Sequence, residues 1–116
     1  MRTALALCAL LIAGPAFAGI NDPTWNPPAR FDHSYSGKLT LRRLPQKQVV
    51  TECAKLFARY KVEATASLKQ RGCSAITSKT SCTVITVDKP YALATPQAVL
   101  RHELGHCNGW PASHPD

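Results

Sequence analysis

The run His102-Glu103-Leu104-Gly105-His106 has the residue types and the spacing that a hydrolytic metal site needs. On a helix, side chains at i and i+4 lie on one face, so both imidazoles can reach the same metal ion. Zinc binds neutral imidazole, and a carboxylate beside the metal can take a proton from zinc-bound water. We therefore expect His102 and His106 to bind Zn²⁺ and Glu103 to act as the general base.

A third protein ligand is expected, because catalytic zinc generally has three such ligands and one water. Gly109 allows the chain to reverse after the helix, and His114 follows within a short loop. We expect His114 to be the third ligand, with Asp116 as the alternative. His33 lies far earlier, in an irregular segment, and we expect no role for it.

The segment 102–114 resembles the zincin metallopeptidases, and in particular the metzincin pattern H-E-x-x-H-x-x-G-x-x-H. Four residues match it position by position: His102, Glu103, His106 and Gly109. The pattern fails at Ala112, where the third metzincin ligand would fall, and its Met-turn is missing because Met1 is the only methionine. The chain therefore resembles small, exported bacterial zincin-like proteins rather than a named metzincin family.

The resemblance implies zinc-dependent hydrolysis of a peptide or protein substrate, with Glu103 moving a proton from the zinc-bound water to the leaving amine. It also implies an extended substrate aligned on an edge strand, for which we expect residues 82–87. Tyr91 is a weak candidate to help stabilise the oxyanion. Because the chain is short, we expect either a shallow cleft or one that a protein partner or the arm 19–37 completes.

Two other functions compete with the peptidase interpretation. One is a non-catalytic zinc- and disulfide-stabilised binding module of the cell envelope. In that protein Glu103→Gln would leave function intact. The other is a disulfide-framed interaction domain in which His102 and His106 bind no metal.

The metal-binding run falls in the best-defined helix of the sequence. Thr95 can cap this helix, Pro96 suits its first position and Gly109 ends it. Apolar residues recur along one stripe, which should face the core and turn the histidines toward a cleft: Leu100, Leu104 and Cys107.

The segments before this helix predict an α+β fold with a long helix and a small sheet. We expect a strand over 38–44 with Leu39 and Leu41 on a buried face, and a helix over 46–70 that stops at Gly72. Residues 73–77 and 82–87 predict a hairpin. This order resembles a minimal zincin core, and we expect residues 38–116 to form one such domain.

The chain contains five cysteines, of which four remain if Cys8 leaves with a signal peptide. We expect two disulfides. A tight hairpin would place Thr77 opposite Cys82 and keep Cys73 roughly 13 Å from it, too far for a bridge. The remaining pairings are 53–73 with 82–107, which we favour, and 53–82 with 73–107.

The first residues predict export. Residues 1–18 combine a basic start, an apolar run and an Ala16-Phe17-Ala18 cleavage site, so we expect a periplasmic or secreted chain that begins at Gly19. Residues 19–37 predict an irregular, Pro-rich arm, and no segment predicts a membrane span. The net charge is +7 with dispersed basic residues, which favours a solvated surface over nucleic-acid binding.

Overall fold

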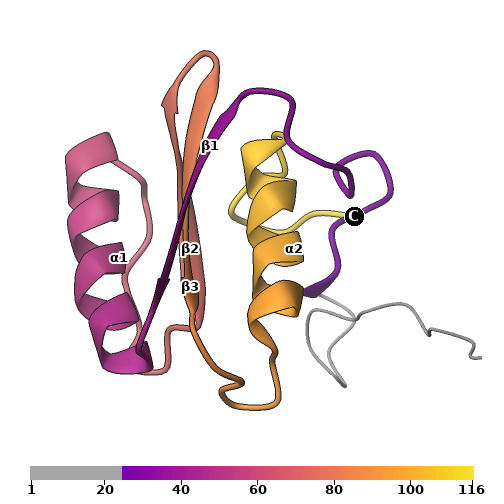
Figure 1. Cartoon of the computed structure of the whole chain (residues 1–116). Coiled ribbons are helices and arrows are strands. Elements are labelled where there is room, and N and C mark those ends of the chain that lie inside the picture. Colours follow the sequence, from indigo (N-terminus) through magenta and orange to yellow (C-terminus); the bar gives the residue numbers. More distant parts are fainter. Residues whose placement is uncertain (1–24) are drawn as a thin grey trace, which may run out of the picture.

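The computed structural model describes residues 25–116, which form a three-stranded sheet with one helix on each face (Figure 1). The elements in chain order are β1 (Lys38–Leu44), α1 (Gln46–Tyr60), β2 (Gly72–Ser78), β3 (Ser81–Val87) and α2 (Pro96–Cys107). This confirms the α+β class, the hairpin and the C-terminal helix. The predicted signal peptide, residues 1–18, lies outside the described residues. Within them, no helix is both long and apolar enough to cross a bilayer.

The sheet has the order β1-β3-β2, so β3 is its central strand. It runs parallel to β1 and antiparallel to β2. Val84, Ile85, Thr86 and Val87 are all buried, as expected for a β-branched strand covered on both faces. The prediction that residues 82–87 align a substrate as an edge strand is therefore wrong, because both edges of β3 are already paired. The edge strands are β1 and β2.

Strand β1 lacks the buried face that its alternating pattern predicted. Leu39 and Leu41 are each 36% exposed, and only Leu44, at the end of the strand, packs against the core. The reason is position: β1 lies at an edge and packs mainly against β3, whereas both helices pack against β2 and β3. Alternation in a sequence does not reveal whether a second layer reaches the strand.

Helix α1 ends at Tyr60, so the predicted continuation to residue 70 is wrong. Lys61 adopts the left-handed conformation (φ 53°) and closes the helix by donating its N–H to the Phe57 carbonyl. Val62 donates to the same carbonyl at 2.9 Å. Gly72 is not a helix stop but the first residue of β2, where a Cβ would overlap the Val99 side chain and approach the Ile85 carbonyl within 2.7 Å.

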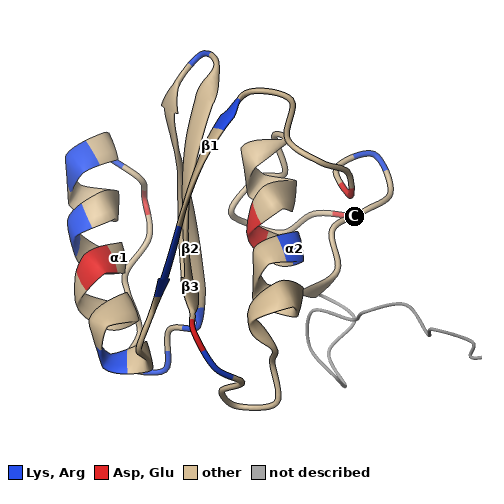
Figure 2. Ribbon diagram, viewed as in Figure 1, with Lys and Arg blue, Asp and Glu red and all other residues tan. Residues whose placement is uncertain are grey.

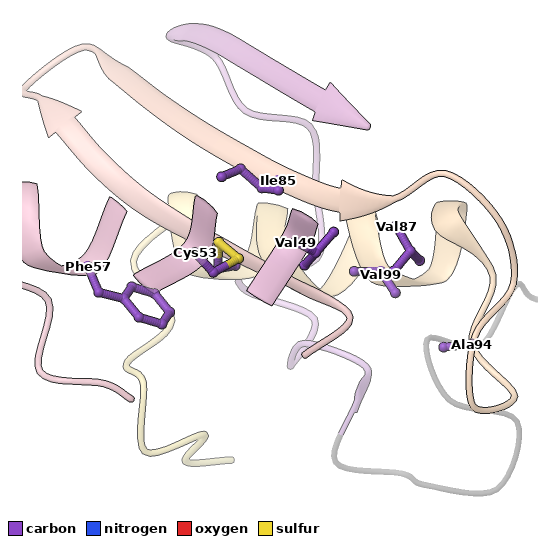
Figure 3. Packing of buried hydrophobic residues seen from close by; sticks show 8 residues of the cluster. Val49, Cys53, Phe57, Ile85, Val87, Ala94 and Val99 are labelled. Atoms are coloured by element: carbon purple, nitrogen blue, oxygen red, sulfur yellow. A yellow bond between two sulfur atoms is a disulfide. The ribbon is translucent and has the colours of Figure 1, made fainter. Parts of the chain in front are cut away.

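Two disulfides tie one helix each to the sheet. Cys53 on α1 bonds to Cys73 on β2, and Cys82 on β3 bonds to Cys107 on α2, which confirms the favoured pairing. The first lies in the main core beside buried apolar residues of α1, β3 and α2 (Figure 3). The predicted hairpin register is off by one, because a bulge between Ile76 and Ser78 places Ile76 opposite Cys82.

Removing the Cys82–Cys107 disulfide should lower the free energy of unfolding by about 2–5 kcal/mol. The bond closes a separation of 25 residues and anchors the helix that carries the candidate site. Urea unfolding of the Cys82→Ala, Cys107→Ala double variant measures the effect. The Cys53→Ala, Cys73→Ala variant is the matched control, because its separation of 20 residues predicts a similar entropic loss. An unchanged urea midpoint would contradict the prediction.

Candidate metal centre

Helix α2 starts and ends where its sequence predicted, and this places residues 102–106 on a regular helix. The Thr95 hydroxyl accepts a hydrogen bond from the Ala98 N–H at 3.1 Å, and Pro96 is the first helical residue. After the helix, Gly109 has φ 102°, a conformation that favours glycine. The turn at Gly109 directs the C-terminal segment back over the helix.

The imidazoles of His102, His106 and His114 converge on one point. Their Nε2 atoms are 3.2 Å apart between His102 and His106, and 3.1 Å from each of these to His114. In a tetrahedral zinc site with bonds of about 2.0–2.1 Å, ligand nitrogens lie roughly 3.3 Å from one another. The structure thus brings together the three predicted ligands at the spacing that a metal ion requires.

The tautomers of two imidazoles also fit a metal. His102 Nδ1 lies 2.8 Å from the Trp25 carbonyl oxygen, and His106 Nδ1 lies 2.7 Å from that of Trp110. A carbonyl only accepts, so each Nδ1 carries the proton and each Nε2 presents a lone pair. Two lone pairs 3.2 Å apart repel each other, and a cation between them removes the repulsion. Three imidazole nitrogens suit Zn²⁺ and other first-row divalent ions alike.

His114 is held over the helix by the C-terminal turn. Trp110 is buried, stacks on the His106 ring with centroids 4.8 Å apart, and donates its indole N–H to the Pro115 carbonyl at 2.8 Å. The His114 N–H donates to the Pro111 carbonyl at 2.9 Å. Although His114 itself is exposed, the turn that carries it is fixed at both ends.

The other residues considered for the site, Asp116, His33 and Tyr91, lie outside the cluster of three histidines. In the described part of the chain, the one group of potential metal ligands comprises the three histidines, without Asp116. The Asp116 carbonyl accepts from Arg30 at 2.9 Å. His33 is exposed, with Nδ1 3.0 Å from the Ser34 carbonyl. Tyr91 packs against the core and does not line the pocket that contains the histidines.

Glu103 lies beside the cluster with its side chain buried. It accepts a hydrogen bond of 2.7 Å from the Ser74 hydroxyl on β2 and lines the same pocket as the histidines. Burial raises the pKa of Glu103 to about 7, and the Ser74 hydrogen bond offsets part of the rise. Burial also lowers the pKa of His102 to about 4 and that of His106 below its ordinary value. The site therefore favours neutral imidazoles beside a carboxyl that exchanges its proton near neutrality.

The irregular arm, from residue 25 to 37, packs along α2. Asp32 accepts from Arg101 at 2.9 Å and forms an ion pair with it, and Pro27 lies against Gly105. The Asn108 amide donates to the carbonyls of Phe31 and His33. These contacts hold the Trp25 carbonyl against His102. The described part of the predicted arm, residues 25–37, thus supports the site.

Sequence reasoning missed three groups that orient the site: the carbonyls of Trp25 and Trp110 and the hydroxyl of Ser74. Every residue has a carbonyl, so acceptors of this kind leave no trace in the sequence. The two tryptophans of the chain are the one weak signal, because both lie close to the histidine rings.

Replacing Asp32 with Asn should weaken metal binding by about tenfold, because it removes the ion pair that holds the arm and its carbonyl on His102. Zinc titration against a competing chelator measures the affinity. Glu52→Gln is the matched control, since Glu52 pairs with Arg42 and Lys55 at comparable exposure but far from the histidines in the fold. Equal zinc affinity in both variants would show that the arm does not support the site.

Comparison of the chain with models of protein families, with curated proteins and with solved structures gave no match. Functional interpretation therefore depends on the geometry of the site.

Proposed function

We propose that this protein is an exported zinc-dependent peptidase of the zincin type. In this proposal His102, His106 and His114 bind Zn²⁺, and Glu103 is the general base. One observation carries it: the buried Glu103 carboxyl lines the same pocket as three converging imidazole nitrogens. The two disulfides support an extracellular or periplasmic location, where such bonds persist.

The residues divide the chemistry among them. When bound, zinc polarises the substrate carbonyl and lowers the pKa of water. Glu103 accepts a proton from the attacking water and returns it to the leaving amine nitrogen. The Ser74 hydroxyl fixes the carboxylate through Oε2, and the Trp25 and Trp110 carbonyls keep the metal-facing nitrogens of two histidines deprotonated.

The edge of β2 is the proposed place for the substrate backbone. Strand β2 pairs with β3 on one side only, and its residues 72–76 line a pocket of about 950 Å³ that also contains the histidines. An extended peptide can add to such an edge through main-chain hydrogen bonds. This replaces residues 82–87 with residues 72–78 as the substrate-aligning strand.

Metal content and peptide cleavage test the proposal together. The chain from Gly19 on is purified under oxidising conditions with zinc supplied, and its metal is measured by elemental mass spectrometry. We expect one zinc per chain, lost in His114→Ala and retained in His33→Ala, whose imidazole lies outside the cluster. The parent should cleave peptides in a mixed library, stop when zinc is chelated and recover when it is restored.

The outcomes separate the competing functions. Absence of zinc in the parent would leave a disulfide-linked domain without a metal and refute the proposal. Zinc lost in His114→Ala, without cleavage of any library peptide, would favour the non-catalytic binding module.

A further inference from the structure

The pocket that contains the histidines continues beyond them to the segment that joins α1 to β2. Lys69 and Arg71 line that part of the pocket, directly before the first residue of β2. Among the described residues that line the pocket, Glu103 is the one carboxylate, and its side chain is buried against Ser74. The start of β2 is therefore a basic part of the proposed substrate groove, and Lys61, just after α1, is a third basic residue that lines the same pocket. Figure 2 shows basic residues here and also on α1 and β1, so charge alone does not single out this place.

The backbone around Lys69 is held in position from the start of α1. The Gln46 amide donates to the carbonyl of Leu68 at 2.9 Å and to that of Gln70 at 3.2 Å, one on each side of Lys69. The Lys69 N–H donates to the Ser67 hydroxyl at 3.1 Å. The Lys69 side chain therefore starts from a defined backbone position beside the groove.

Arg71 places a second positive charge between Lys69 and the metal centre. Its guanidinium lies over the Trp25 ring, 3.6 Å from the centroid, and donates to the Ala92 carbonyl at 3.1 Å. The Trp25 ring in turn lies 4.7 Å from that of His102.

The spacing along β2 relates this basic end to the scissile bond. Ser74, which holds Glu103, lies three positions after Arg71 on a nearly extended chain. At about 3.3 Å per residue, this corresponds to about 10 Å. A peptide extended along β2 with its scissile bond beside Glu103 then presents a group about three residues away to Arg71. Lys69 lies two positions further along the chain.

We propose that the substrates of this protein carry a carboxylate that binds Lys69, beside Arg71, about three to five residues from the scissile bond. This rests on the proposed peptidase function. The carboxylate is either an Asp or Glu side chain or the C-terminus of the peptide, since both present the same acceptor to an ammonium group. The protein is then selective for acidic peptides, or for bonds close to a free C-terminus.

The test uses zinc-loaded protein and sets of decapeptides. Each set differs in one group: Glu against Gln at a single position, or a free against an amidated C-terminus. For the preferred position we expect kcat/KM to be about fivefold higher with the carboxylate, the ratio that about 1 kcal/mol provides. Lys69→Gln should abolish this ratio. Lys79→Gln, in the exposed hairpin turn, should keep it and is the matched control.

The two peptide comparisons, Glu against Gln and a free against an amidated C-terminus, identify the source of the carboxylate. Each outcome decides the proposal. Cleavage at equal rates with and without either carboxylate, or a ratio unchanged in Lys69→Gln, overturns the inference and leaves the peptidase function standing. If nothing is cleaved, fluorescence anisotropy of the same labelled peptides on Glu103→Gln protein decides. Binding that needs both the carboxylate and Lys69 supports a carboxylate-binding site at Lys69, while the peptidase function and the position of a scissile bond are refuted. Binding without that dependence, or none, overturns the inference.

Discussion

Glu103→Gln should lower kcat for peptide hydrolysis by about 10²–10⁴-fold, and the protein should keep the metal that we propose binds the three histidines. The amide has nearly the same shape and can still accept from the Ser74 hydroxyl, but it cannot take a proton from water. The three metal-binding imidazoles are unchanged. Single-turnover cleavage of a library peptide and elemental analysis of the same sample measure the two quantities.

Glu63→Gln is the matched control, because Glu63 is exposed and does not line the pocket with the histidines. It should cleave at the parent rate. Loss of zinc together with activity in Glu103→Gln would mean that Glu103 maintains the site rather than acts as its base. Full activity in Glu103→Gln would exclude the general-base role.

The raised pKa of Glu103 gives the same variant a second expected property, in the metal-free protein. Because the pKa in the folded state lies above the ordinary value of 4.5, at about 7, the carboxyl contributes stability below about pH 4.5 that is lost as the pH rises through 7. Gln does not ionise, so metal-free Glu103→Gln should be more stable than the parent at pH 8, by on the order of 3 kcal/mol, and similar at pH 4. Urea unfolding in a chelator at both pH values measures the difference. Equal stability of the two proteins at pH 8 would contradict the raised pKa of Glu103.

Much of the candidate site follows from the sequence because its information is local. Thr95, Pro96 and Gly109 set the bounds of α2, and a regular helix then places His102 and His106 on one face whatever the rest of the chain does. The position of His114 beside the other two histidines depends on Gly109, which has a positive φ, and on the short turn that follows it. Such features need no knowledge of the tertiary fold.

What the sequence did not predict depends on contacts between distant segments. The order of strands decides whether β2 or β3 is free at an edge, and local patterns carry no information about it. The end of α1 at Tyr60 reflects a left-handed Lys61, a residue type that gives no stop signal. The carbonyl that orients His102 belongs to Trp25, which is distant in the sequence. The Asp32–Arg101 ion pair helps to hold the segment that carries Trp25 against α2.

Removing the metal should lower the free energy of unfolding by about 4 kcal/mol. The reference is protein in a free zinc concentration a thousand times the dissociation constant of the zinc site. The folded chain positions three Nε2 atoms 3.1–3.2 Å apart, an arrangement that the unfolded chain does not hold, so we expect zinc to bind the folded state preferentially. Urea unfolding at pH 7.5, with zinc or with a chelator, measures the difference. The two disulfides stabilise the folded chain equally in both conditions.

His106→Gln separates binding at this site from other effects of zinc. The glutamine amide can still donate to the Trp110 carbonyl, as the His106 ring does, but it supplies no nitrogen lone pair to the metal. This variant should unfold at nearly the same urea concentration with zinc and with the chelator. A zinc-dependent shift that persists in His106→Gln would place the metal elsewhere, whereas a parent indifferent to zinc would mean that the three imidazoles converge without holding an ion.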